Sequence, residues 1–324
     1  MAKQPQESVT VTLPAVPLGY CKLGTQVAGH TFEASNAAAI GLLQDAGEGK
    51  VFKPLGKPEC GEREINFYES LAAAIAATSA TGNDLNGRGD SNLTDLATLA
   101  ALAPHVPRYY GQQKLFVNQR QHTFLKLEDL THGMSKPCVM DVKVGRRTWD
   151  PLSSAHKRAI EEQKYVICKQ QLGLCLPGFQ VYTPQLVRQG RDYGKALDVA
   201  GFRQALALFF NSSHSSSETV LREVLRQLCG IRAWFKRQRL LHFYASSLLI
   251  CYDYEQLHHV KQSATHLTNG HQLEQRPAPP VDQWVHVRCI DFAHIFPAKD
   301  AEPDQNYMFG LQSLIDIVES MLQR

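Results

Sequence analysis

The sequence predicts a mixed fold of strands and helices, in the α+β or the α/β class. Two observations carry this prediction. Alternating or β-branched runs typical of strands occupy Lys50–Leu55, Pro137–Gly145 and Val285–Asp291. Apolar residues at helical spacing mark Glu62–Ala77, Ser153–Gln171 and Tyr307–Gln323. The 324 residues correspond to about two structural units and can bury a core without disulfides.

The individual elements follow from local patterns. The strand 50–55 comes directly after the turn-forming Asp45–Gly49. In the helix that follows, Ile65, Tyr68 and Leu71 form one apolar stripe, and the carboxyl-terminal helix repeats this spacing from Leu311 onward. Polar residues predict a flexible segment at 1–18, a disordered loop at 80–94 and a flexible loop at 262–281 that ends in prolines.

Composition excludes several classes of protein. The 34 Lys and Arg nearly balance the 31 Asp and Glu, so the chain lacks the basic field of a nucleic-acid-binding protein. We find neither the apolar region of a signal peptide nor an apolar run of the ~18 residues that span a bilayer. The eight cysteines form no C-x-x-C pair, which favours reduced thiols in the cytosol or nucleus and indicates no zinc site.

The strand Pro137–Gly145 carries the most informative pattern. Asp141 and Lys143 lie on one face together with Val139. The residues of the other face are apolar: Met140, Val142 and Val144. A carboxylate can deprotonate an attacking hydroxyl and a lysine can neutralise phosphate oxygens, so this pair suits phosphoryl transfer. A surface ion pair on an edge strand is the alternative that alternation alone leaves open.

Pro137, Asp141, Lys143 and Gly145 complete the pattern P-x-x-x-D-x-K-x-G, which resembles the signature of the inositol polyphosphate kinases. Further segments resemble landmarks of that family, in the family's order: Arg63-Glu64 with Phe67-Tyr68, Tyr193–Lys195, Ser246–Leu249, Asp291–His294 and Gly310-Leu311. The resemblance runs from about Gln26 to the carboxyl end. It implies a two-lobed α+β fold of the ATP-grasp or protein-kinase-like type, with an N-lobe at 19–130 and a C-lobe at 131–324 that carries a short inositol-binding helical segment.

The resemblance also implies an ATP site and a metal. Lys53 would hold ATP phosphates and Glu64 would orient it, although the local sequence alone favours an exposed lysine at a strand edge. Further ATP contacts are assigned by the resemblance to Glu128, Leu130, Asp141 and Asp291. Independently, antiparallel pairing of 247–253 with 285–291 would make Ser247 and Asp291 neighbours, and both offer the hard oxygen ligands that Mg²⁺ prefers.

For the substrate, the resemblance implies Asp141 and Lys143 as catalytic residues, with Lys143 also in contact with the inositol phosphate. Further substrate contacts would come from Lys157, Lys164 and His294. Lys157 and Lys164 are seven residues apart in the predicted helix, which places them on one face. Glu161 and Glu162 within the same stretch favour a solvated helix face instead.

The short segment between Lys164 and Tyr193 leaves little room for a large inositol-binding insertion, which favours the multikinase branch of the family. We therefore expect transfer from ATP, with Mg²⁺, to the 3- and 6-hydroxyls of inositol 1,4,5-trisphosphate, giving tetrakis- and pentakisphosphates. Hexakisphosphate kinase, trisphosphate 3-kinase and non-catalytic scaffold remain alternatives. A protein kinase is excluded, because no H-R-D loop or D-F-G motif is present.

The same interpretation gives the expected setting of the chain. Its partners would be inositol phosphates, with phosphoinositide lipid headgroups open as further substrates, and neither nucleic acid nor stable membrane insertion is expected. We expect a monomer in the nucleus and cytoplasm.

Overall fold

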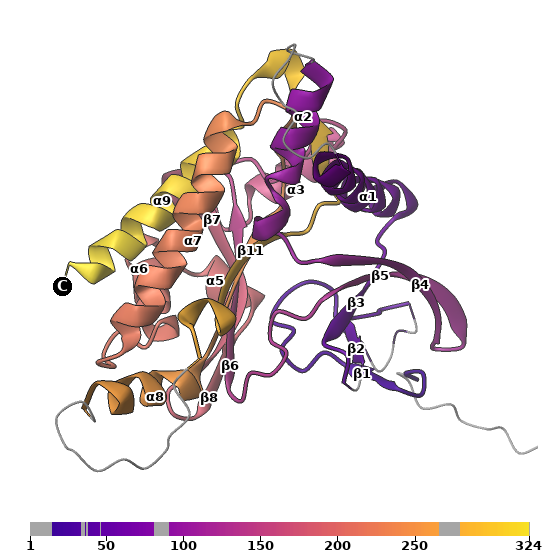
Figure 1. The fold of residues 1–324 in the computed structure, drawn as a ribbon. Helices are drawn as coiled ribbons and strands as arrows, with labels where there is room; N and C mark the ends of the chain where they lie inside the picture. Colours follow the sequence, from indigo (N-terminus) through magenta and orange to yellow (C-terminus); the bar gives the residue numbers. More distant parts are fainter. Residues whose placement is uncertain are drawn as a thin grey trace, which may run out of the picture.

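The computed structural model describes residues 15–323 except 34–35, 37, 46, 81–90 and 266–278. Figure 1 shows two main sheets side by side, the second covered on its outer face by long helices. Every strand pair in the described part is antiparallel, which assigns the fold to α+β rather than α/β. No helix of these residues is long and apolar enough to cross a membrane.

The first sheet has the strand order β1-β2-β3-β5-β4. Its strands are β1 (Tyr20–Lys22), β2 (Leu43–Asp45), β3 (Lys50–Pro54), β4 (Tyr109–Val117) and β5 (Arg120–Glu128). Phe52 and Phe124 fill its small apolar core, together with Leu43 and Val117. Because β3 is the central strand, Lys53 is not on a strand at the edge of this sheet.

The second sheet has the order β11-β10-β6-β7-β8. Its strands are β6 (Pro137–Val144), β7 (Leu174–Tyr182), β8 (Leu186–Gln189), β10 (Ser247–Asp253) and β11 (Val285–Ile290). A two-stranded sheet pairs β9 (Leu241–Phe243) with β12 (Ile295–Pro297). The strand that carries Asp141 and Lys143 is central, so the alternative of an edge strand is excluded.

Helices cover the second sheet on the face away from the first sheet (Figure 1). The helices of the described residues are α1 (Pro58–Ala80), α2 (Ser91–Ala100), α3 (Ala155–Glu162), α4 (Val166–Leu172), α5 (Arg191–Lys195), α6 (Val199–Phe209), α7 (Ser217–Arg237), α8 (Tyr254–Thr265) and α9 (Gln305–Leu322). Those on this outer face include α6, α7 and α9, and α1 lies beside the first sheet (Figure 1). Short 3₁₀ turns occupy Ala103–His105, Val281–Gln283 and Lys299–Ala301. Met140, Val142 and Val144 face the large core, as the alternation in the sequence predicted.

Helix α1 joins the two sheets through apolar and aromatic contacts. Phe67 and Tyr68 belong to the core of the second sheet, and their rings lie 4.2 and 5.4 Å from that of Phe292. Trp234 Nε1 on α7 donates a hydrogen bond of 2.7 Å to the carbonyl of Thr98 on α2. The predicted division into lobes at residue 130 stays a prediction, because helices from the first part pack into the core of the second.

Three predictions about connecting segments need correction. Residues 1–14 lie outside the described part, but Ala15 N–H donates to Asn118 Oδ1 at 2.8 Å and Val16 packs on the first core, so these two residues are held in place. Of the predicted loop 80–94, residue 80 ends α1 and 91–94 begin α2, while 81–90 are outside the described residues. In the loop 262–281, residues 262–265 belong to α8 and 266–278 are not described.

The predicted helix Ser153–Gln171 is two helices. Tyr165 has a positive φ of 55°, which interrupts the helix between α3 and α4. The Lys169 ammonium donates to the Glu161 carbonyl, so it satisfies one of the open carbonyls at the end of α3. Lys164 lies in this break, and the prediction that it shares a helix face with Lys157 is therefore wrong.

Candidate active site

Polar residues of three adjacent strands meet on the face of the second sheet opposite its large core. In the register, Lys143 on β6 lies opposite Ser247 on β10, and Ser247 lies opposite Ile290 on β11. Asp141 is two residues before Lys143 and shares its face. The sequence-based expectation of antiparallel β10 and β11 is confirmed, and it brings Asp291, the residue after Ile290, next to this group.

Two buried oxygens in this group have no partner. Asp141 is 6% exposed and Ser247 is fully buried, yet neither Asp141 Oδ1 nor Ser247 Oγ makes a hydrogen bond within the described residues. Buried polar atoms in native proteins are nearly always satisfied, so such orphans indicate a missing ligand, water or ion. The Lys143 side chain, which is only half-buried, faces the same space.

Strand β6 ends immediately after these residues at a glycine that the turn requires. Gly145 has a φ of 110°, a region that L-residues with a side chain rarely adopt. A Cβ at this position would lie 2.5 Å from Asn306 Nδ2, whose side chain holds the turn through the backbone of Arg147. Steric constraints on the turn thus explain why the last residue of the P-x-x-x-D-x-K-x-G pattern is glycine.

Lys53 connects the first sheet to this group. Its ammonium donates to Glu64 Oε1 on α1 at 2.7 Å and to Asp291 Oδ1 at 2.6 Å. Glu64 also accepts a hydrogen bond of 3.0 Å from the Phe292 backbone. The pairing of Lys53 with Glu64 that the sequence suggested is present, and the contact with Asp291 extends it across the two sheets. Asp291 itself has a φ of 65°, the kind of strain often found at functional sites.

The pKa values of the two carboxylates of the site are shifted in opposite directions. Burial, together with the neighbouring Asp291 carboxylate, raises the pKa of Asp141 to about 6. Burial would also raise the pKa of Asp291, but the charges of Lys53 and Lys143 outweigh it and hold that pKa below its usual value. Asp141 is therefore the better proton acceptor near neutral pH, and Asp291 is the permanent anion.

A substitution of Lys53 tests whether this ion-pair network stabilises the fold. Lys53→Met leaves Glu64, whose side chain is 4% exposed, without its counterion. We expect the free energy of unfolding to fall by about 1–3 kcal/mol, below the ~3–5 kcal/mol of a fully buried pair, because Asp291 is partly exposed. Urea unfolding measures it. Lys50→Met, on the same strand but paired with surface Glu48, is the control; an equal loss there would contradict the account.

The segment that joins the two sheets lies next to the site. Glu128 ends β5, and its carboxylate accepts a hydrogen bond of 3.1 Å from the Arg108 backbone. Leu130 is buried against Val139 and Cys251, on the same sheet face as Asp141. No backbone acceptor within the described residues takes the N–H of Leu130.

On the opposite side of Lys143, His294 has a buried partner that the sequence did not reveal. His294 Nδ1 lies 2.6 Å from Asp150 Oδ2, and the ammonium of Lys157 lies 3.8 Å from the same oxygen. Asp150 also accepts from Ser153 Oγ and from the Leu152 backbone. The turn pattern D-P-x-S could have indicated a local role for Asp150, but no local pattern reports a contact 144 residues away.

A second missed contact fixes the segment that contains Asp291 and His294. Arg63 Nη1 donates to the Ala293 carbonyl at 2.7 Å, and its guanidinium stacks 4.4 Å from the Phe296 ring centroid. Arg63 was predicted only as part of a helix motif next to Glu64. The two consecutive residues of α1 therefore hold the middle of the Asp291–His294 segment, at Phe292 and Ala293.

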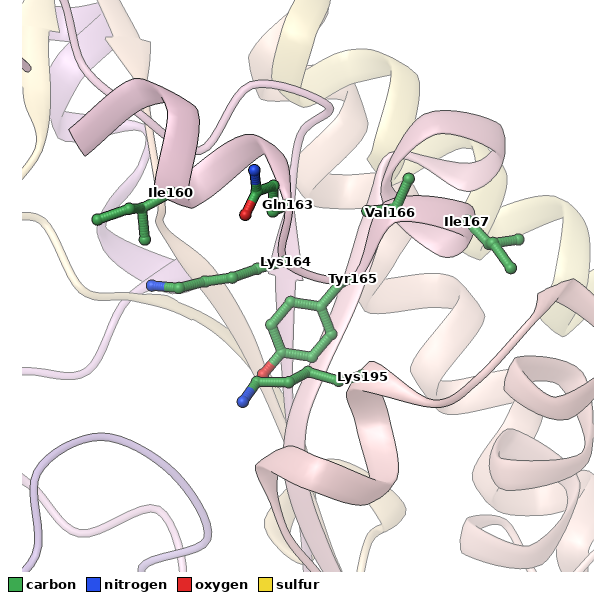
Figure 2. A pocket seen from close by; sticks show the side chains of 7 residues that line it. All are labelled: Ile160, Gln163, Lys164, Tyr165, Val166, Ile167 and Lys195. Atoms are coloured by element: carbon green, nitrogen blue, oxygen red, sulfur yellow. The ribbon is translucent and has the colours of Figure 1, made fainter. Parts of the chain in front are cut away.

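Lys164 opens onto a pocket of about 410 Å³ between the α3–α4 junction and α5 (Figure 2). The lining residues are Ile160, Gln163, Lys164, Tyr165, Val166, Ile167 and Lys195. Burial raises the pKa of Tyr165 to about 12, so its hydroxyl is a permanent donor. Tyr165 and Lys195 were not predicted as site residues, and the left-handed backbone of Tyr165 that forms the pocket has no signal in the sequence.

A divalent cation fits the residues present only in part. No cluster of three or more His, Cys, Asp or Glu side chains able to hold a metal occurs in the described part of the chain. Mg²⁺ bound with nucleotide phosphates needs only one or two protein oxygens, however. The unpartnered Ser247 Oγ and the negatively charged Asp291 supply such oxygens.

The fold and this arrangement define a two-lobed kinase-like protein, and comparison with known proteins identifies the family. The inositol polyphosphate kinase family model matches residues 124–319. Inositol polyphosphate multikinase of Mus musculus is 31% identical over 291 residues, covering 88% of this chain and 67% of that protein. This chain therefore belongs to the inositol polyphosphate kinase family.

Other relatives agree with this assignment. Inositol hexakisphosphate kinase 1 of Mus musculus is 32% identical over 233 residues, covering 63% of this chain and 53% of that protein. The chain spans only about half the length of several curated relatives. The structure of the inositol phosphate multikinase Ipk2 from S. cerevisiae, in complex with ADP and Mn²⁺, shares the fold, with a TM-score of 0.59 at 20% identity over 84% of this chain and 99% of that one.

Proposed function

We propose that this chain is an ATP- and Mg²⁺-dependent inositol polyphosphate multikinase. One observation carries the proposal. Lys53 on the first sheet contacts both Glu64 on α1 and Asp291, and Asp291 lies next to Ser247 and Asp141 on one face of the second sheet. This set supplies three groups that phosphoryl transfer uses. They are a lysine for the ATP phosphates, oxygen ligands for a metal, and a carboxylate for the attacking hydroxyl. The ADP and Mn²⁺ of the yeast relative support the same cofactors here.

On the nucleotide side, the Lys53 ammonium would hold ATP phosphates while Glu64 keeps it in position. The backbone between Glu128 and Leu130 would hold adenine, using the N–H of Leu130. Ser247 and Asp291 would bind Mg²⁺, which neutralises charge on the transferred phosphoryl group when it is bound. Asp141 and Asp291 would also line the space that the terminal phosphate of ATP occupies.

On the substrate side, Asp141 would accept the proton of the attacking inositol hydroxyl. Its pKa of about 6 suits a base at neutral pH, because most of the carboxylate is then ionised and still basic. The Lys143 ammonium would contact the transferred phosphate and a phosphate of the substrate. Lys157, Lys164 and His294 would hold the other phosphates, with Asp150 keeping His294 in its orientation.

The proposed reaction is phosphorylation of inositol 1,4,5-trisphosphate at the 3- and 6-hydroxyls to tetrakis- and pentakisphosphates. Only the short α4, β7, β8 and the start of the short α5 separate Lys164 from Tyr193, which leaves the site open to more than one ring orientation. Phosphoinositide headgroups present the same ring and are proposed as further acceptors. We also propose that the protein acts as a monomer in the nucleus and cytoplasm.

The experiment is an assay of the purified chain with Mg-ATP and, separately, inositol 1,4,5-trisphosphate, inositol hexakisphosphate and a short-chain phosphoinositide. We expect tetrakis- and pentakisphosphate from the trisphosphate, with phosphorus NMR locating the new groups at positions 3 and 6. Turnover of hexakisphosphate alone would instead assign the hexakisphosphate kinase branch, which the likeness to hexakisphosphate kinase 1 supports. ATP binding without transfer to any acceptor would favour a non-catalytic protein.

A further inference from the structure

Glu161 places a negative charge beside the lysines proposed to bind the substrate. It lies in the last turn of α3, and its Oε1 accepts a hydrogen bond of 2.6 Å from the Lys164 ammonium. Its Oε2 lies 3.4 Å from the hydroxyl of Thr148, and its backbone carbonyl accepts from Lys169. The side chain is 24% exposed, so this carboxylate is a partly buried element of the site rather than a freely solvated surface group.

The carboxylate of Glu161 remains ionised in this position. Burial works against the charge, but Lys164, Lys143 and Lys169 outweigh burial and lower the pKa of Glu161. Because Lys143 is among these cations, the negative charge is close enough to the proposed reaction centre to act on a ligand there. The Lys164 ammonium is therefore already paired before any phosphate arrives.

The next residue provides an internal comparison. Glu162 is exposed, and its carboxylate accepts a hydrogen bond of 3.2 Å from Trp149 Nε1. Within the described residues it forms no ion pair with a lysine. The two adjacent glutamates of this helix thus differ in burial and in their partners, and only Glu161 forms an ion pair with a lysine that lines the pocket.

We propose that Glu161 is a specificity-determining residue that limits how many phosphates the substrate carries on the Lys164 side of the ring. A further phosphate there, beside the one that Lys164 would hold, would lie next to a carboxylate, and like charges in contact are strongly disfavoured. A free hydroxyl could instead donate a hydrogen bond to Glu161 while a phosphate elsewhere on the ring contacts Lys143. The proposal rests on the proposed function, since it assumes that an inositol phosphate binds next to Lys143.

The test compares Glu161→Gln with Glu162→Gln, using inositol tris-, tetrakis- and hexakisphosphate as acceptors. Glutamine keeps the size and the hydrogen-bonding oxygen and removes only the charge. For Glu161→Gln we expect KM for the tetrakisphosphate to fall about fivefold or more, as expected for relief of a like-charge contact. For the same variant, KM for the trisphosphate and kcat should change less than about twofold. Glu162→Gln should have the same KM and kcat values as the wild type for every acceptor.

Calorimetric Kd values for the same three ligands separate this proposal from the proposed function. If the wild type transfers no phosphate, the proposed function fails, while the ratio of Kd values still tests Glu161. A second arm repeats Glu161→Gln in a Lys164→Met background, where the carboxylate has lost its partner cation and the fall in KM for the tetrakisphosphate should be at least as large. Equal KM and Kd values for wild type and Glu161→Gln, or the same change in Glu162→Gln, would overturn the proposal.

Discussion

Replacing Asp141 by Asn should lower kcat by about a hundred- to ten-thousandfold without unfolding the chain, because it removes the proposed proton acceptor and keeps its shape. The carboxylate stands on the central strand β6, 6% exposed, with one oxygen free to meet a substrate hydroxyl. Asparagine fills the same space but accepts no proton at neutral pH. The loss should therefore appear in kcat, while KM for ATP changes little.

The same substitution, which lowers kcat, should leave the stability of the fold unchanged or raise it. Burial raises the pKa of Asp141, so at neutral pH the folded state holds a charge that it disfavours relative to the unfolded chain. Asp141→Asn should thus melt at the same temperature as the wild type or higher. Residues that serve function often reduce the stability of the fold, so replacing them commonly has this effect. Asp316→Asn, on the exposed face of α9, is the control for both measurements. An active Asp141→Asn, or one inactive because it is unfolded, would contradict the assignment.

Replacing Asp291 by Asn should abolish metal-dependent turnover, with kcat/KM lower by at least about a hundredfold. Asp291 is the carboxylate whose low pKa keeps it charged, and it pairs with Lys53 while lying next to Ser247. Asparagine is neutral and a poorer ligand for Mg²⁺. We expect weaker binding of Mn²⁺ in the presence of nucleotide, measured by the paramagnetic effect of Mn²⁺ on water relaxation.

The backbone of Asp291 calls for a matched control, because φ at this position is 65°. Asparagine tolerates such a conformation about as well as aspartate, so strain should not explain the loss. Asp300→Asn makes the same substitution at an exposed residue with a φ of 55°. Wild-type metal binding by Asp291→Asn, or an equal defect in Asp300→Asn, would show that the metal assignment is wrong.

Much of the site follows from strand periodicity, since alternation depends only on local sequence. It placed Asp141 and Lys143 on one face and the apolar side chains on the other. Equal lengths of two runs were enough to predict the antiparallel pairing that brings Ser247 close to Asp291. The position of Lys53 opposite Glu64 required the family resemblance, because a lysine beside Pro54 also fits a strand edge.

The rest depends on contacts between distant residues or on backbone conformations without a sequence signal. Asp150 meets His294, and Arg63 meets Ala293, across separations that no local pattern spans. The helical spacing of apolar residues predicts one helix over 153–171. The structure instead breaks it at Tyr165, where Lys169 satisfies the end of α3. That break separates Lys157 from Lys164, and the pocket that Lys164 lines lies between it and α5.

The central claim, that nucleotide, metal and inositol phosphate meet on this sheet face, is tested most directly by one crystal structure. The chain would be crystallised with a non-hydrolysable ATP analogue, Mn²⁺ and inositol 1,4,5-trisphosphate. We predict an anomalous Mn²⁺ peak bound by Asp291 and Ser247, phosphates on Lys53, and a ring hydroxyl on Asp141. A metal peak away from Asp291, or an inositol phosphate out of reach of Asp141 and Lys143, would contradict the account.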